Sequence, residues 1–466
     1  MSTLTILQQT TSSKKVALVE QQYPYGKSSV YMPTALVVVA AQLMAAGHEA
    51  HIVDLNIDPV VEGGPVKLFF EAVDVIGVAV IGAPYIPQTI ELCRRFAVEY
   101  PNKPVIVGGQ IISRLSQLQF SRLFAFTNAI QIASAEDLHP LFGQVPSPYE
   151  VSLVPVYEHL GMGRLCEYLK HEFPLWVSQG CAFNCKEYCT AERNQLEQHH
   201  HLEHFKDGIE YLILFAKKWA LQDLGCYASS LDFFQNPDTV AQYLEVIAEL
   251  RKKHDFNFRV RALSCLVTFL KAANTLPEFG KLLKDAGFWR VGFGVDGSGE
   301  SEWKRQGKVQ NHTADVRRSL DLCQKLGLQA EVIMITGYPT SSYKELAKTV
   351  YNSSGYLLRW RNIKLRAYFA KLVLPGNTGW QREWRTVEAV LDNPKLFYNL
   401  EFNSLGSPLT NPRRLNRWFG NLAFLILTLG VAIFGRSISF PLLPQGQGGL
   451  YGKLAKFWNR HMPIVD

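Results

Sequence analysis

The chain has 466 residues, of which 47% are hydrophobic and 19% charged, and its formal net charge is +7. This length can bury two or three apolar cores, and the composition excludes an intrinsically disordered protein. Basic residues form no stripe with interleaved aromatic residues, so we expect no nucleic-acid partner. Residues 1–15 lack the apolar segment of a secretory signal peptide. We therefore expect a cytoplasmic, reducing compartment, in which clustered cysteines bind metal or take part in catalysis.

Short apolar runs alternate with helical stretches after a flexible tail at residues 1–14. The sequence predicts strands and helices in turn, with strands at 15–20, 49–55, 75–81 and 104–107 and helices at 34–46 and 88–100. This alternation predicts a doubly wound parallel sheet over residues 15–145, with ligands beyond the carboxyl ends of the strands. The loops there offer backbone that a large flat ligand can approach closely. Their residues include Gly82, Ala83, Tyr85, Gly108, Gly109 and Gln110.

A second alternating region follows a proline-containing linker with a short helix at residues 146–172. Strands are expected at 175–178, 225–229, 257–262, 289–296, 330–336 and 363–369. Helices fall between them, for instance at 237–254, 313–326 and 342–357. Six strand–helix units of this length predict an incomplete parallel barrel of the TIM type, a partial (β/α)6 barrel, over residues 173–375. In such barrels the chemistry takes place on the loops that follow the strands.

Residues 376–466 lose this alternation, and we expect a C-terminal, mainly helical region there. Residues 418–435 carry no charge. As a helix they would span about 27 Å, slightly less than the hydrocarbon core of a bilayer, so a buried helix is one interpretation. Residues 450–460 place apolar side chains on one face with basic side chains beside it, as in an interfacial helix. Peripheral attachment to a membrane, with a lipid-like substrate, is the alternative hypothesis.

Three cysteines lie on one short loop directly after the first predicted barrel strand: Cys181, Cys185 and Cys189. Three thiolates can each bind one iron of a cubane cluster and leave the fourth iron open to an exogenous ligand. The alternative is a zinc site completed by a histidine, because several histidines follow closely. These are His199, His200, His201 and His204.

This loop resembles the cysteine motif of the radical S-adenosylmethionine superfamily, C-x3-C-x2-C with an aromatic residue before the last cysteine. Tyr188 takes the aromatic position, but one additional residue gives C-x3-C-x3-C here. The N-terminal region is similar to the cobalamin-binding domain that precedes many of these enzymes. Four later segments, 229–237, 259–262, 292–296 and 337–339, resemble the loops after barrel strands two to five. The resemblance covers roughly residues 15–375.

The resemblance implies three cofactors, which are a 4Fe–4S cluster on the three cysteines, S-adenosylmethionine and cobalamin. It implies that Ser229, Ser230 and Asp232 hold the amino acid part of S-adenosylmethionine. Arg261 and Asp296 are then candidates for its carboxylate or ribose. The glycine loops of the N-terminal domain would contact the corrin ring, and the absence of a D-x-H-x-x-G motif implies a cobalt whose lower face is open or water-bound.

The implied activity is methylation of a carbon centre through methylcobalamin and a 5′-deoxyadenosyl radical. The same two domains could instead carry out a rearrangement or cyclisation, or a methyl transfer without a free radical. A non-catalytic iron–sulfur or cofactor-binding protein is the hypothesis from a different class. The expected partners are a small-molecule, lipid or peptide substrate and a protein that reduces the cluster.

Overall fold

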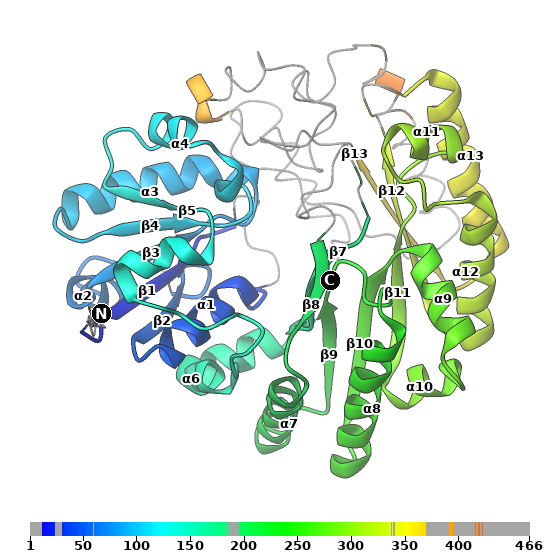
Figure 1. Cartoon of the computed structure of the whole chain (residues 1–466), viewed down its shortest axis with the longest axis horizontal. Helices are drawn as coiled ribbons and strands as arrows, with labels where there is room; N and C mark the ends of the chain where they lie inside the picture. Colours follow the sequence, from blue (N-terminus) through cyan, green and yellow to red (C-terminus); the bar gives the residue numbers. More distant parts are fainter. Residues whose placement is uncertain are drawn as a thin grey trace, which may run out of the picture.

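The computed structural model describes residues 12–23, 30–58, 60–183, 185, 195–336, 338, 341–369 and 391–395, together with residues 415, 418, 419 and 422. The side chains of residues 195, 196, 336 and 367–369 fall outside this description. Figure 1 shows two α/β units, each built around a parallel sheet.

The N-terminal unit is a five-stranded parallel sheet with strand order β2-β1-β3-β4-β5. Its strands are β1 (Lys15–Glu20), β2 (Glu49–Asp54), β3 (Val75–Ala79), β4 (Val105–Gly108) and β5 (Ala129–Ile132). Apolar runs such as that of β1 are buried on both faces, which is typical of a parallel sheet. The strand order reverses between β1 and β3, so this unit is doubly wound, as the sequence predicts.

Helices cover both faces of this sheet. Val16 and Leu18 of β1 pack in one apolar cluster with α1 (Thr34–Ala45) and α6 (Val154–Leu169). Ala17 and Val19 belong to a second cluster on the opposite face. That cluster includes side chains from α2 (Pro65–Ala72), α3 (Ile86–Glu99) and α4 (Gln117–Leu123). The strict alternation of side chains along β1 therefore divides the unit into two apolar layers.

The second unit is a six-stranded parallel sheet with strand order β13-β12-β11-β10-β9-β6. Its strands are β6 (Phe173–Trp176), β9 (Asp223–Ser229), β10 (Asn257–Ser264), β11 (Phe288–Gly294), β12 (Gln329–Thr336) and β13 (Ile363–Phe369). Its helices are α7 (Leu202–Lys218), α8 (Pro237–His254), α9 (Leu266–Thr275), α10 (Phe279–Asp285), α11 (Glu300–Arg305), α12 (Thr313–Leu326) and α13 (Tyr343–Arg359). The sheet curves with its helices outside, which confirms the partial barrel (Figure 1).

Helix α6 joins the two units. Tyr168 donates a hydrogen bond to Asp54 over 2.8 Å, and Arg164 donates one to the carbonyl of Ile52 over 2.6 Å. The apolar cluster around α1 and α6 also continues without a break into β6 and α7. The linker predicted at 146–172 with a short helix therefore contains two helical segments, which meet at a kink at Gly161 and are fixed to the end of β2.

Several element bounds agree with the sequence prediction, among them α8 and α12. The antiparallel hairpin of β7 (Ser178–Cys181) and β8 (Gln195–His199), the helices α2 and α4, the short α5 (His139–Phe142) and strand β5 were not predicted. Almost all of the C-terminal region at 376–466 lies outside the described residues. Within the part of the chain that is described, no helix has both the length and the apolar content that crossing a bilayer requires.

A cluster of phenylalanines fills the space between β10, β11 and their helices. Phe269 of α9 lies at its centre, fully buried, with its ring 5.2 Å from that of Phe293 and 5.3 Å from that of Phe234. In contrast, Phe126 on a loop of the N-terminal unit is 95% exposed.

We predict that Phe269→Ala lowers the free energy of unfolding by about 3–5 kcal/mol, because the cavity cannot collapse in a packed aromatic cluster. The matched control Phe126→Ala should change it by less than about 0.5 kcal/mol. Urea denaturation followed by circular dichroism measures both values. Equal effects of the two substitutions would contradict this description of the core.

Candidate functional site

The cysteine loop follows the first barrel strand, as predicted. Cys181 is the last residue of β7, and the side chains of Cys181 and Cys185 are buried, with exposed fractions of 9% and 8%. Cys189 and Tyr188 lie outside the described residues. Among the residues that are described, no three cysteine, histidine or acidic side chains are grouped to hold a metal ion. The third cysteine of the predicted cluster is not part of that set.

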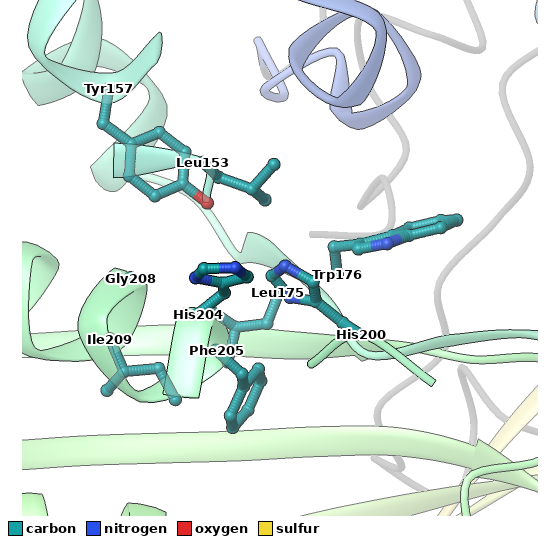
Figure 2. A pocket seen from close by; sticks show the side chains of 9 residues that line it. All are labelled: Leu153, Tyr157, Leu175, Trp176, His200, His204, Phe205, Gly208 and Ile209. Carbon is teal, nitrogen blue, oxygen red and sulfur yellow. The ribbon is translucent and has the colours of Figure 1, made fainter. Parts of the chain in front are cut away.

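The histidines of the zinc alternative lie at the start of α7. The Nε2 atom of His200 is hydrogen-bonded to the carbonyl of Val151 over 2.9 Å, and its ring lies 6.2 Å from that of His204. Both rings line a small pocket between α6, β6 and α7 that has room for about one water molecule. Figure 2 shows this pocket, whose other lining residues are almost all apolar. These two histidines thus belong to the junction of the two units.

Gln235, in the loop after β9, the second strand of the barrel, holds the cysteine loop in place. The backbone N–H of Ala182, directly after Cys181, donates to Oε1 of Gln235 over 2.8 Å. The Nε2 atom of Gln235 donates to Glu197 over 3.2 Å, and Ser178 donates to the same carboxylate over 2.6 Å. Gln235 lies in the segment that resembles the second-strand loop, but nothing in the sequence marks it as a contact of the cysteine loop.

Ser229 is the last residue of β9, and Ser230 and Asp232 follow it directly, at the strand end where the sequence predicts them. Asp232 is buried, and its Oδ1 accepts hydrogen bonds from Ser264, from Thr268 and from the backbone N–H of Cys265, over 2.7–3.0 Å. Burial raises the pKa of this carboxyl above its usual value. Its Oδ2 is also buried and has no hydrogen-bond partner among the residues described here. Asp232 therefore fixes the first turn of α9 through Oδ1, and its Oδ2 can accept a hydrogen bond from a further donor.

Cys265 shows that several of these groups gather at one end of the barrel. Burial raises the pKa of its thiol well above the usual value, and the charges of Asp232, Cys181 and Cys185 raise it further. The nearby ammonium of Lys308 acts in the opposite direction. The loops after β7, β9, β10 and β11 thus meet at the carboxyl end of the barrel, as expected for a parallel barrel.

Asp296 follows β11 in a left-handed backbone conformation, with φ of +47°. Its carboxylate forms a buried ion pair with Lys308, whose Nζ also donates to the carbonyl of Gly294 over 3.0 Å. The structure therefore places a cation next to Asp296, which the resemblance makes a candidate contact of S-adenosylmethionine. Asp296 remains a predicted contact of that cofactor, and Lys308 was not foreseen because it lies in an irregular loop.

Arg261 lies within β10, three residues before its end, because β10 extends to Ser264 and not only to residue 262 as predicted. Its guanidinium donates to both carboxylate oxygens of Glu172 over 2.5–2.9 Å and to Glu331 over 3.2 Å. It also lies over the ring of Tyr227, 4.6 Å from the centroid. Arg261 thus has a structural role inside the barrel, below the level of the cysteine loop. Its predicted contact with S-adenosylmethionine stays a prediction.

We predict that Arg261→Met lowers the free energy of unfolding by about 3–5 kcal/mol, because it leaves the partly buried carboxylate of Glu172 without its cation and removes one cation from the fully buried Glu331. Arg259→Met on the same strand is the control, since Arg259 and Asp223 form an exposed pair worth about 0–1 kcal/mol. Urea denaturation compares the two variants. Loss of S-adenosylmethionine binding in an Arg261→Met protein of normal stability would contradict the structural role.

The glycine loops of the N-terminal unit lie at the carboxyl ends of β3 and β4. Gly109 has φ of +127°, and a Cβ atom there would lie 2.3 Å from the carbonyl oxygen of Val80, so only glycine fits. Gly109 and Gln110 are exposed, Gly82 and Gly108 are partly exposed, and Ala83 and Tyr85 pack into the apolar core. Ile81 beside them is 53% exposed and was not predicted. The exposed backbone and this apolar side chain form a surface that suits a flat ligand.

An acidic pair is buried at the neighbouring strand ends. Glu20 ends β1 and Asp54 ends β2, and both are almost completely buried. Burial raises the pKa of Glu20 to about 8, and the charge of Asp54 raises it as well. At neutral pH Glu20 is therefore a neutral carboxylic acid beside the point where the strand order reverses.

This shift makes stability depend on pH. The unfolded chain releases the proton of Glu20 near pH 4.5, whereas the folded chain keeps it until about pH 8. The folded state thus binds more protons between these values, and the stability that Glu20 contributes falls as the pH rises through this window.

We predict that Glu20→Gln raises the free energy of unfolding at pH 7.5 by about 1–3 kcal/mol and flattens its dependence on pH between 5 and 8. Glu62→Gln, a change at an almost fully exposed carboxylate, is the control and should leave the pH dependence unchanged. Chemical denaturation at four pH values checks this. A wild-type stability that rises from pH 5 to pH 8 in step with the Gln variant would show that Glu20 is ionised.

The carboxyl end of the barrel meets the N-terminal unit at β12. Ile335 near the end of this strand and Tyr338 just beyond it are buried in the same apolar cluster as Tyr85 and Ile112. Arg122 of α4 also forms an ion pair with Asp392. These contacts bring the carboxyl ends of the strands in the two sheets close together. The candidate residues of both sheets lie at those strand ends.

A scan of the sequence against models of protein families and a search of curated protein sequences both give no match. Solved structures do match. The radical S-adenosylmethionine methyltransferase TsrM from Kitasatospora setae, with cobalamin and a 4Fe–4S cluster bound, aligns with a TM-score of 0.60 at 16% identity, over 80% of this chain and 75% of TsrM. A second TsrM structure, with tryptophan and an analogue of S-adenosylmethionine bound, gives 0.61 at 17% identity, over 80% and 77% of the two chains.

The cobalamin-dependent S-adenosylmethionine radical enzyme OxsB, with aqua-cobalamin bound, aligns with a TM-score of 0.59 at 14% identity. The match covers 96% of this chain but only 66% of OxsB, so the chain spans about two thirds of that enzyme. Identities this low establish a common fold. The chain therefore has the two-part α/β fold of cobalamin-dependent radical S-adenosylmethionine enzymes, which confirms the fold that the cysteine motif and the strand pattern predict.

Proposed function

We propose that this chain is a cobalamin-dependent radical S-adenosylmethionine enzyme that methylates a carbon centre. One observation carries the proposal: a buried pair of cysteines from the predicted motif lies at the carboxyl end of a parallel barrel, and that end packs against the ligand-binding edge of a second parallel sheet. Both edges are where ligands of such sheets bind. The structure of TsrM, which holds cobalamin and a 4Fe–4S cluster, and that of OxsB, which holds aqua-cobalamin, support the proposal through their common fold.

The donor atoms of the cysteine loop suit an iron–sulfur cluster. Cys181 and Cys185 are buried, a hydrogen-bond donor of Gln310 faces the sulfur of Cys185, and the buried ammonium of Lys308 lies near it. Cationic and hydrogen-bonding surroundings favour thiolate over thiol. We assign Cys181, Cys185 and Cys189 to a 4Fe–4S cluster, with Cys189 assigned from the sequence alone.

The surroundings also suit the two other cofactors. The Oδ2 atom of Asp232, which has no hydrogen-bond partner among the described residues, is a buried acceptor at the barrel end and suits the ammonium group of S-adenosylmethionine. The exposed backbone at Gly82, Gly108 and Gly109, with Ile81, suits the corrin of cobalamin. When bound, these groups supply a 5′-deoxyadenosyl radical and a transferable methyl group. The chain itself orients them, and the apolar contacts of Ile335 and Tyr338 exclude water between the two units.

The same arrangement serves a rearrangement or cyclisation, and it leaves the substrate class open among small molecules, lipids and peptides. We propose that a separate low-potential electron-transfer protein reduces the cluster. Attachment to a membrane surface through the C-terminal region remains part of the proposal and concerns residues outside those described.

We predict that the full chain, reconstituted anaerobically with iron and sulfide, binds about four iron atoms. Cys181→Ala and Cys185→Ala should each lose most of the iron, whereas Cys166→Ala should keep it, because that thiol lies on α6, outside the cysteine loop. Iron analysis and electron paramagnetic resonance of the reduced protein measure this. A wild-type chain that binds zinc and no iron under these conditions would overturn the proposal.

The products distinguish the reactions. With cobalamin, a reductant and candidate substrates, formation of both 5′-deoxyadenosine and S-adenosylhomocysteine indicates radical methylation. 5′-Deoxyadenosine alone indicates a rearrangement or cyclisation, and S-adenosylhomocysteine alone indicates methyl transfer without a free radical.

A further inference from the structure

The segment between β11 and α12 consists of α11 and a loop after it. This loop extends over the carboxyl end of the barrel to the cysteine loop. Trp303 donates to the carbonyl of Val295 over 2.6 Å, and Asn311 donates to the carbonyls of Gly294 and Val295 over 3.2 and 3.3 Å. Lys308 donates to the carbonyl of Gly294 as well. Trp303 of α11 and two side chains of the loop after it thus contact the end of β11, which gives the residues between them a fixed position.

Gln310 is one of those residues, and its amide faces a cysteine of the motif. Its Nε2 lies 3.7 Å from Sγ of Cys185, within the range of an N–H···S hydrogen bond. A thiolate bound to iron only accepts hydrogen bonds, so the nitrogen and not the oxygen of the amide must point to it. The Oε1 atom is buried and has no hydrogen-bond partner within the described part of the chain. The amide is therefore oriented by the sulfur.

Lys308, two residues earlier, adds a positive charge beside this contact. It is buried and ion-paired with Asp296. Burial acts to lower the pKa of its ammonium, but Asp296, Cys185 and Cys265 together raise it above its usual value. The side chain is thus a cation in the immediate surroundings of Cys185.

Hydrogen bonds to the sulfurs and nearby charges set the reduction potential of an iron–sulfur cluster. A cluster gains one negative charge when it accepts an electron. A donor and a cation next to a ligand thiolate stabilise this reduced state more than the oxidised one.

We infer that Gln310, held beside Lys308, is a positioning residue that donates a hydrogen bond to the Cys185 thiolate and raises the reduction potential of the cluster. The inference rests on the proposed function, since it requires a cluster on Cys185. It gives a function to the loop before α12, which neither the cysteine motif nor the strand pattern predicts to be functional. It also implies that the electron partner can be a weaker reductant than a cluster without this donor would need.

The test is the midpoint potential of the reconstituted full chain, measured by a redox titration followed by electron paramagnetic resonance. Gln310→Leu keeps the volume of the side chain and removes the donor. It should shift the reduction equilibrium about threefold to tenfold toward the oxidised cluster, which is about 30–60 mV for one electron. Gln310→Glu should shift it at least as far, because a carboxylate repels the thiolate.

Val309→Ala is the matched control on the same loop, because Val309 is 69% exposed and has no role in the contact. Its potential and its iron content should equal those of the wild type. A Gln310→Leu protein with full iron content and an unchanged potential would overturn the inference and leave the proposed function intact. A wild-type chain that assembles no cluster would instead overturn the proposed function, and the inference with it.

Discussion

The contact between β12 and the N-terminal unit is the packing interaction on which the candidate site depends. A parallel sheet gathers the loops after its strands at one edge, but two such sheets can present those edges in any relative direction. Here Ile335 and Tyr338 are buried in the apolar core that contains Tyr85, so the two edges converge. The continuous core from α1 through α6 to β6 fixes the opposite side of the junction. The glycine loops of one sheet are thereby brought to the same side of the molecule as the cysteine loop of the other.

Below the cysteine loop, several charged side chains lie inside the barrel beside the ring of Tyr227. Within the part of the chain that the structure describes, Arg261, Arg290, Lys364 and Arg366 lie near two carboxylates, those of Glu172 and Glu331. Burial lowers the pKa of Lys364 to about 8, and the neighbouring arginines lower it as well. Ion pairs of this kind cost desolvation energy and seldom increase stability over an apolar core. These ion pairs do connect particular strands, since Arg261 of β10 contacts both Glu172, directly before β6, and Glu331 of β12.

At the end of the barrel that carries the cysteine loop, several polar side chains form hydrogen bonds with backbone groups. Gln235 holds the backbone of Ala182, Asp232 holds the start of α9, and Asn311 holds the end of β11. These contacts make the loops rigid enough to keep two thiols at set positions. Gln310 differs from them, because its amide contacts the sulfur itself. The loops therefore both position the cysteines and determine the electrostatic surroundings of their sulfur atoms.

The sequence by itself determined the two α/β units, the parallel pairing and the place of the cysteine motif. It could do so because apolar periodicity and strand–helix alternation are local signals, and helices such as α8 and α12 were predicted to the residue. Only the tertiary structure decided which partners the polar residues have. Arg261 looks like a residue of a strand end until β10 is seen to continue to Ser264, and Lys308 and Gln310 lie in a loop without periodicity. Such contacts join residues far apart in the chain, so their spacing carries no local pattern, and only the folded arrangement of the strand ends creates them.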